Sequence, residues 1–255
     1  MNRISRAFSG EKAFIPFITG GDPDTETTEK LLYALRDAGA SAIEIGIPFS
    51  DPVAEGPVIE AASYRALAGG CTVDSLFDLV ARVRGDFEIP ILFMTYYNPV
   101  FSYGIKRFLS RASEAGLDGL IVPDLPYAER EELLVPCKAC EIELISLIAP
   151  TTEERITKIA ENSSGFLYCV SSLGVTGARS TLDDSAKQMI SQVKKVSSIP
   201  CAVGFGISTP GQARDMAAFS DGVIVGSAIV RLVAEHGCDC IEPVYEFARS
   251  IRESI

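Results

Sequence analysis

Short apolar runs recur along the chain, and each is followed by a longer stretch with helical periodicity. The runs are rich in β-branched residues and closed by Gly, Pro or Asp, which predicts buried parallel strands. The predicted strands cover residues 13–19, 41–47, 90–95, 119–122, 141–148, 165–170, 200–203 and 221–225. The predicted helices cover residues 25–38, 59–67, 73–83, 105–115, 128–137, 153–161, 183–196, 210–219 and 227 to the C-terminus.

This alternation predicts an α/β fold, a closed (β/α)8 TIM barrel with a short N-terminal helix, in one catalytic domain over residues 1–255. A doubly wound open sheet is the alternative. It usually has fewer strands and a glycine-rich turn after the first of them. Here the glycine-rich turns follow the seventh and eighth strands, at 204–206 and 226, which favours the barrel.

Composition and charge narrow the function. The chain has 255 residues, of which 47% are hydrophobic, so it can bury a large core. Its net charge of -11 argues against nucleic acid and anionic membranes as partners. The segment Met1–Lys12 lacks the apolar core of a signal peptide, and no apolar run approaches a membrane span of about 20 residues. We therefore expect a cytoplasmic protein.

Seven cysteines are scattered along the chain. Cys137 and Cys140 form a CxxC motif, which Cys238 and Cys240 could complete into a zinc tetrad. No glycine-rich knuckle surrounds either pair, so free and mostly buried thiols are the favoured interpretation. His236 is the only histidine, which argues against histidine-based metal sites and a Ser-His-Asp triad.

Glu44 is the main candidate for chemistry, because it interrupts the apolar second strand. Side chains alternate along a strand, so Ile43, Ile45 and Ile47 share one face, while Glu44 shares the other with the small residues Ala42 and Gly46. Burial raises the pKa of a carboxylate towards the range useful for proton transfer. A structural ion pair is the alternative interpretation.

A second acid, Glu55, follows in the loop after that strand. The loop is stiffened by Pro52 and Pro57 and turns at Gly56, so its carboxylate could close over a ligand held above Glu44. An ordinary solvated loop glutamate is the alternative, and the residues alone favour it.

Glycines at the ends of the last three strands indicate an anion site. They lie in Gly204-Phe205-Gly206, in Gly226-Ser227 and in Gly174-Val175-Thr176-Gly177. Glycine lets backbone N–H groups approach an anion, and the helix beginning at Ser227 would direct its positive end towards it. The loops that follow strands 7 and 8 of such barrels often bind phosphate. Tight turns alone would also explain the glycines.

Four further residues lie near predicted strand ends and are candidates for ligand contacts. Asp124 could instead brace its own loop. Phe17 and Tyr96 could line an apolar cavity, and Tyr168 lies near the end of the sixth strand, but aromatic residues at such positions are more often core.

Motifs in the same order along nearly the whole chain give a family resemblance. They are Pro16-Phe17-Ile18-Thr19-Gly20-Gly21-Asp22-Pro23, Glu44-Ile45-Gly46-Ile47-Pro48-Phe49-Ser50-Asp51-Pro52 with Gly56-Pro57, Tyr96-Tyr97-Asn98-Pro99, Pro123-Asp124-Leu125-Pro126, Gly174-Val175-Thr176-Gly177, Gly204-Phe205-Gly206-Ile207-Ser208 and Gly226-Ser227-Ala228-Ile229-Val230. With these motifs the chain resembles the tryptophan synthase α subunit family.

The resemblance implies a lyase of tryptophan biosynthesis that cleaves indole-3-glycerol phosphate to indole and glyceraldehyde 3-phosphate by a retro-aldol reaction, without a cofactor. Glu44 matches the family's central acid/base residue. Glu55 matches the position that holds the indole nitrogen, where the family usually has aspartate. The acid here is one methylene longer, so its loop must sit back by roughly one bond length.

The resemblance also assigns ligand contacts and a partner. Phe17 and Tyr96 would flank the indole, and Tyr168 would lie near the glycerol chain. Substrate-binding positions also fall on Asp124, Thr176, Gly177, Gly206, Gly226 and Ser227. The implied partner is the pyridoxal-phosphate-dependent β subunit, in an αββα tetramer, contacted largely through the loop Pro48–Pro52. Indole is apolar and would diffuse away unless it were passed on directly.

One departure from the family pattern and two other functional hypotheses leave alternatives open. Ser172 stands where many members have arginine, so one contact from the lid at 173–180 would be missing. A free-standing lyase that releases indole, and a non-catalytic phosphate-binding barrel that regulates a partner, are the other functional hypotheses.

Overall fold

Eight parallel strands close into a barrel in which each strand pairs with its neighbours along the chain, and β8 pairs with β1. The computed structural model describes residues 2–150, 153–170, 179–204 and 206–255. The strands are β1 (Ala13–Thr19), β2 (Ile43–Gly46), β3 (Ile91–Met94), β4 (Gly119–Ile121), β5 (Glu143–Ile148), β6 (Leu167–Val170), β7 (Cys201–Gly204) and β8 (Gly222–Val225). The predicted TIM barrel is confirmed, and the open sheet is not formed.

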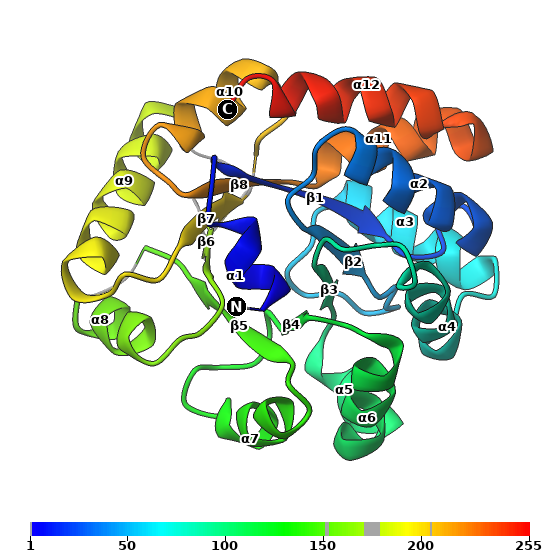
Figure 1. The fold of residues 1–255 in the computed structure, drawn as a ribbon, viewed down its shortest axis with the longest axis horizontal. Helices are drawn as coiled ribbons and strands as arrows, with labels where there is room; N and C mark the ends of the chain where they lie inside the picture. Colours follow the sequence, from blue (N-terminus) through cyan, green and yellow to red (C-terminus); the bar gives the residue numbers. More distant parts are fainter. Residues whose placement is uncertain (1, 151–152, 171–178, 205) are drawn as a thin grey trace.

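Helices surround the strands, with α1 at the centre of the view (Figure 1). They are α1 (Arg3–Ala7), α2 (Thr25–Asp37), α3 (Pro57–Ala68), α4 (Val73–Val83), α5 (Tyr97–Tyr103), α6 (Ile105–Ala115), α7 (Glu131–Ala139), α8 (Glu153–Glu161), α9 (Arg179–Val196), α10 (Pro210–Ala217), α11 (Ser227–His236), the 3-10 turn η1 (Gly237–Asp239) and α12 (Ile241–Arg252). None of the helices in the described part of the chain has the length and apolar character that a membrane crossing requires.

Two helical regions differ from the prediction. The helix α5 was not predicted, and its first N–H group, that of Tyr97, donates 2.9 Å to Oδ1 of Asp124 in the next loop of the barrel. This cap is distant in sequence, so local pattern could not indicate it. The C-terminal helical stretch divides at Gly237, whose φ of 57° lies outside the right-handed α-helical region, so α11 ends there and α12 is separate.

The barrel wall separates two apolar layers. Ile43 and Ile45 of β2 pack in the outer layer beneath the helices, with Leu76 of α4 and Phe93 of β3. A separate cluster fills the interior and includes Ala13, Ile15, Phe17, Leu92, Met94, Ile121 and Tyr168. Strands β1 to β4 are therefore buried on both faces, which explains their largely apolar sequences, with Glu44 of β2 as the charged exception.

Helix α1 covers the end of the barrel where the strands begin. Its Ile4 is 2% exposed and joins the interior cluster, and Phe8 packs on Phe166 with ring centroids 5.2 Å apart. Arg3 donates 3.2 Å to Asp118, just before β4. A ligand of the interior must therefore enter from the opposite end, where the strands finish and functional loops of this fold lie.

The cysteines are all free thiols, and four of them are buried. Cys137 lies within α7 and is fully buried, while Cys238 is exposed. Among residues 2–150, 153–170, 179–204 and 206–255, no cluster of histidine, cysteine and carboxylate side chains is arranged to hold a metal ion.

Candidate active site

Glu44 lies on the inner face of β2, where the alternation of side chains placed it. The residue is 1% exposed, and neither carboxylate oxygen has a hydrogen-bond partner among the described residues. Burial, with a smaller contribution from the charge of the nearby Glu55, raises its pKa to about 8. No cation pairs with it in the described part of the chain, so the structural ion pair is not formed. Glu44 thus carries a proton at neutral pH.

Gly46, on the same face of β2 as Glu44, leaves room for the ring of Phe17. Phe17 of β1 is the register partner of Glu44, and its ring lies across Gly46. A Cβ atom at Gly46 would lie 2.6 Å from Cζ of Phe17, so only glycine fits there. An aromatic side chain on the adjacent strand therefore lies in register with the buried acid, in the apolar interior where a flat apolar ligand would bind.

Glu55 is drawn into the same region by the loop that follows β2. Its Oε2 atom is buried without a partner. The pKa of Glu55 is raised to about 7. Burial is the largest cause, the charge of Glu60 acts in the same direction, and the hydrogen bond from the Tyr96 hydroxyl acts against both. A buried carboxylate oxygen and a pKa raised to about 7 do not fit an ordinary solvated loop glutamate. Because its charge also raises the pKa of Glu44, the two carboxyl groups act on each other.

Tyr96, which follows β3, holds this loop in place. The backbone N–H of Ala54 donates to its hydroxyl oxygen at 3.0 Å, and its ring packs on Phe49 with centroids 5.4 Å apart. Tyr96 is 2% exposed. Tyr96 therefore fixes the backbone at Ala54, directly before Glu55. This limits how far the Glu55 carboxylate can extend into the barrel.

Tyr168 of β6 faces the barrel interior from the opposite side. It is buried, and a Cβ atom at Gly204 of β7 would lie 2.7 Å from its ring. Burial raises the pKa of Tyr168 well above its ordinary value, and the charge of Glu44 raises it too. The phenol stays protonated and can serve as a hydrogen-bond donor towards a ligand between β2 and β6.

The predicted anion site is described only in part. Gly226 forms the N-cap of α11, and a Cβ atom there would lie 3.4 Å from the Cβ atom of Phe17, so the start of α11 borders the interior. Ser227 is the first residue of that helix, and Gly206 is exposed with φ 77°. Thr176 and Gly177 lie outside the described residues. So do Ser172 and residues 173–178 of the predicted lid.

Asp124 is exposed and braces the loop after β4 through its bond to the N–H of Tyr97. Its role towards a ligand stays a prediction. The interior residues Met94 and Ile121, on β3 and β4, were not among the predicted site residues. Alternation along those strands could have identified them.

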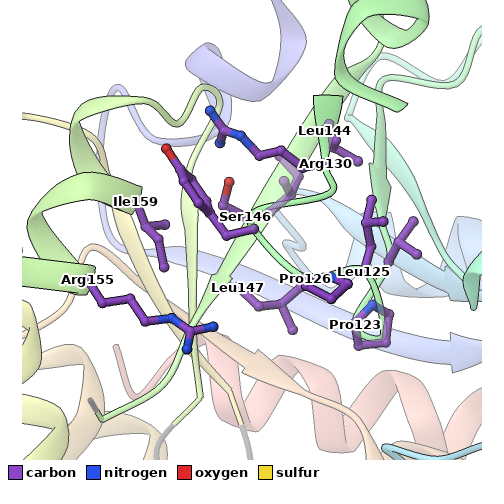
Figure 2. Close-up of a pocket in the computed structure, with 12 residues that line it drawn as sticks. Pro123, Leu125, Pro126, Arg130, Leu144, Ser146, Leu147, Arg155 and Ile159 are labelled. Carbon is purple, nitrogen blue, oxygen red and sulfur yellow. The ribbon is translucent and has the colours of Figure 1, made fainter. Parts of the chain in front are cut away.

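A separate pocket lies beside β5, between the loop that joins β4 to α7 and helix α8 (Figure 2). Arg130 stacks on the ring of Tyr127 at 4.2 Å and donates 2.9 Å to the carbonyl oxygen of Asn162. The Tyr127 hydroxyl donates 3.0 Å to the carbonyl oxygen of Lys158. These polar groups are already engaged, and neither Glu44 nor Glu55 lines the pocket. We therefore place the candidate active site at Glu44.

Glu44 should make folding stability depend on pH. Its pKa is about 8 in the folded state against an ordinary 4.5, so between these values the folded state holds a proton that the unfolded state has lost. The free energy of unfolding then falls as the pH rises through this window. We expect Glu44→Gln to lose less stability than the wild type between about pH 5 and pH 8 in urea unfolding.

Glu55 contributes in the same direction, so some dependence remains in that variant. Glu143→Gln is the matched control, because Glu143 begins β5 and bonds Asn2 at the closed end of the barrel. Equal pH slopes for the wild type and Glu44→Gln would show that Glu44 is not a buried neutral acid.

Comparison with known proteins places the chain in a family. The family model described as tryptophan synthase alpha chain matches residues 5–254. A tryptophan synthase alpha chain of Caldanaerobacter subterraneus subsp. tengcongensis is 50% identical over 260 residues, covering 99% of both chains. One from Lacticaseibacillus casei is 45% identical, covering 100% of this chain and 96% of the relative.

Solved structures agree over the whole barrel. Tryptophan synthase subunit alpha from Legionella pneumophila superposes with a TM-score of 0.90 at 37% identity, covering 100% of this chain and 98% of the other. A chain of the tryptophan synthase complex from Pyrococcus furiosus gives 0.87 at 35% identity, covering 95% and 98%. Full-length matches at these identities leave one assignment: the chain belongs to the tryptophan synthase alpha chain family.

Proposed function

We propose that this chain, acting as one catalytic domain over residues 1–255, cleaves indole-3-glycerol phosphate to indole and glyceraldehyde 3-phosphate. The observation that carries the proposal is Glu44, a buried carboxyl group without a partner at the centre of the barrel of a tryptophan synthase alpha chain. A structural acid would be paired, whereas an acid/base catalyst must be left available for its substrate.

Cleavage needs a proton at indole C3 and the loss of a hydroxyl proton from the glycerol chain. In its protonated form Glu44 gives its proton to C3, and the resulting carboxylate then takes the hydroxyl proton. The bond between C3 and the glycerol carbon breaks, its electron pair returns to the ring, and a carbonyl forms on the departing triose phosphate. A pKa of about 8 suits a group that must both give and take a proton near neutral pH.

The other residues position the substrate. The carboxylate of Glu55 accepts the indole N–H, and the rings of Phe17 and Tyr96 flank the indole. Tyr168 lies beside the glycerol chain, while the backbone at Gly206, Gly226 and Ser227 binds the phosphate. Asp124, Thr176 and Gly177 complete the predicted contacts. Glu44 supplies both proton transfers and Glu55 holds the indole N–H, so the reaction needs no cofactor on this chain.

The product indole is apolar and needs a direct route to its consumer. Solved structures of tryptophan synthase from Mycobacterium tuberculosis and of the tryptophan synthase complex from Pyrococcus furiosus contain chains similar to this one. We propose an αββα assembly with a pyridoxal-phosphate-dependent β chain, in the cytoplasm. Next to the loop Pro48–Pro52, Val53 is 77% exposed, and Phe101 of α5 is 60% exposed. Both are apolar contacts available to a partner.

An indole-release assay tests the proposal. We expect the purified chain to release indole from indole-3-glycerol phosphate slowly when alone and faster with a tryptophan synthase β chain. Equal rates with and without the β chain would favour the free-standing lyase. No release in either case would leave a non-catalytic barrel and overturn the proposed reaction.

A further inference from the structure

Thr19, the last residue of β1, carries a buried hydroxyl group that the fold does not use. The residue is 3% exposed, and its Oγ1 atom has no hydrogen-bond partner among the described residues. Buried polar side chains in folded proteins nearly always have a partner, because losing the hydrogen bonds to water without replacement is costly. Such a hydroxyl therefore calls for a partner that arrives from outside the chain.

The position of Thr19 on its strand directs it into the active site. Ile15 and Phe17 of β1 belong to the interior cluster, and Ile18 belongs to the outer layer. By this alternation Thr19 faces the interior, one step beyond Phe17 towards the open end of the barrel. Its register partner on β2 is Gly46, which offers no side chain to occupy the space or bond the hydroxyl.

Of the five buried side-chain oxygens without a partner in the described residues, four lie on β1, on β2 or in the loop after β2. Both carboxylate oxygens of Glu44, Oε2 of Glu55 and Oγ1 of Thr19 belong to the group. Thr19 and Glu44 lie on adjacent strands, because Phe17 pairs with Glu44 and Thr19 with Gly46. Two buried nitrogen atoms in the described ranges also lack a partner, Nε of Arg3 and Nε of Arg84. Both arginines pair with Asp118 at the closed end of the barrel, away from Thr19.

We propose that the hydroxyl of Thr19 hydrogen-bonds a polar group of the bound substrate, which makes Thr19 a further substrate-contacting residue. A hydroxyl group both donates and accepts, so it suits a hydroxyl of the glycerol chain or the ring N–H. It does not serve the phosphate, which is assigned to the backbone at the start of α11. The inference rests on the proposed function, since it takes indole-3-glycerol phosphate as the ligand.

Two substitutions separate substrate binding from packing. Thr19→Val keeps the shape and removes the hydroxyl, and we expect kcat/KM for indole release to fall about tenfold. Thr19→Ser keeps the hydroxyl, and we expect it to retain most of the activity. The unliganded Thr19→Val protein should be at least as stable as the wild type, because the removed hydroxyl had no partner.

A packing role predicts the opposite order, with Thr19→Ser impaired and Thr19→Val active, and that result would overturn the inference. Thr95→Val is the matched control. Thr95 is 2% exposed, and its Oγ1 also lacks a partner, but it directly follows Met94, which faces the interior, so alternation directs Thr95 towards the helices. We expect Thr95→Val to leave kcat/KM unchanged.

Assaying the wild type beside the variants distinguishes failure of the proposed reaction from failure of the Thr19 inference. If the wild type releases indole and Thr19→Val does so equally well, the Thr19 inference fails and the proposed reaction stands. If the wild type releases none, the reaction fails, and Thr19 is tested by the rise in Tm with indole and glyceraldehyde 3-phosphate. A rise lost in Thr19→Val but kept in Thr19→Ser supports the contact, and any other pattern overturns it.

Discussion

Replacing Glu44 by glutamine should lower kcat for indole release about 1,000-fold, within the range for loss of a general acid/base. Glutamine has nearly the same shape as the protonated glutamate, and Glu44 is protonated at neutral pH because burial raises its pKa to about 8. The variant should therefore fold normally and bind substrate with a similar KM. A large change in kcat with little change in KM indicates an interaction made in the transition state.

The measurement is steady-state indole release by the chain, with and without a β chain. Glu143→Gln serves as the control, because it makes the same chemical change on β5 at the closed end of the barrel. We expect that variant to keep the wild-type kcat. Unchanged indole release by Glu44→Gln would remove Glu44 from the mechanism, whatever the family of the chain.

Replacing Glu55 should have the second largest effect. We expect Glu55→Ala to lose about 100-fold in kcat/KM, because the indole N–H then lacks its acceptor and the substrate is less well oriented. Glu55→Asp is the sharper variant, since the family usually has aspartate at this position. Tyr96 fixes the backbone at Ala54 through the 3.0 Å bond, so the shorter side chain cannot advance with its loop.

We therefore expect Glu55→Asp to lose about tenfold in kcat/KM, from a carboxylate displaced by roughly one bond length. Tyr96→Phe combined with Glu55→Asp should recover part of this loss, because the loop is then free to move inward. Asp51→Asn is the control in the same loop, where the side chain is exposed. Full activity of Glu55→Ala would show that Glu55 does not bind the substrate.

Local pattern was a good guide to the barrel because parallel strands covered on both faces need continuous apolar runs. It failed at α5, which depends on a cap from Asp124, and at the C-terminal helices, which Gly237 divides. The contact from Asp124 and the backbone angle of Gly237 decide these helix boundaries, and neither can be recognised from the spacing of apolar residues within a helix.

For the active site, the alternation of side chains along β2 placed Glu44 on the inner face from the residues alone. For Glu55 the residues alone favoured an ordinary solvated glutamate, because a loop position gives no sign of burial. Only the folded chain brings Tyr96, which follows β3, to the loop after β2, where Glu55 is partly buried and close enough to raise the pKa of Glu44.

The amino-acid sequence by itself thus determined the strand order and the side of the strand on which the acid lies, since both follow from the period of apolar residues. The tertiary structure decided the protonation of Glu44, the burial of Glu55 and the unused hydroxyl of Thr19. These properties depend on the distance between groups from different strands and on the removal of water around them, and neither is encoded in any one segment.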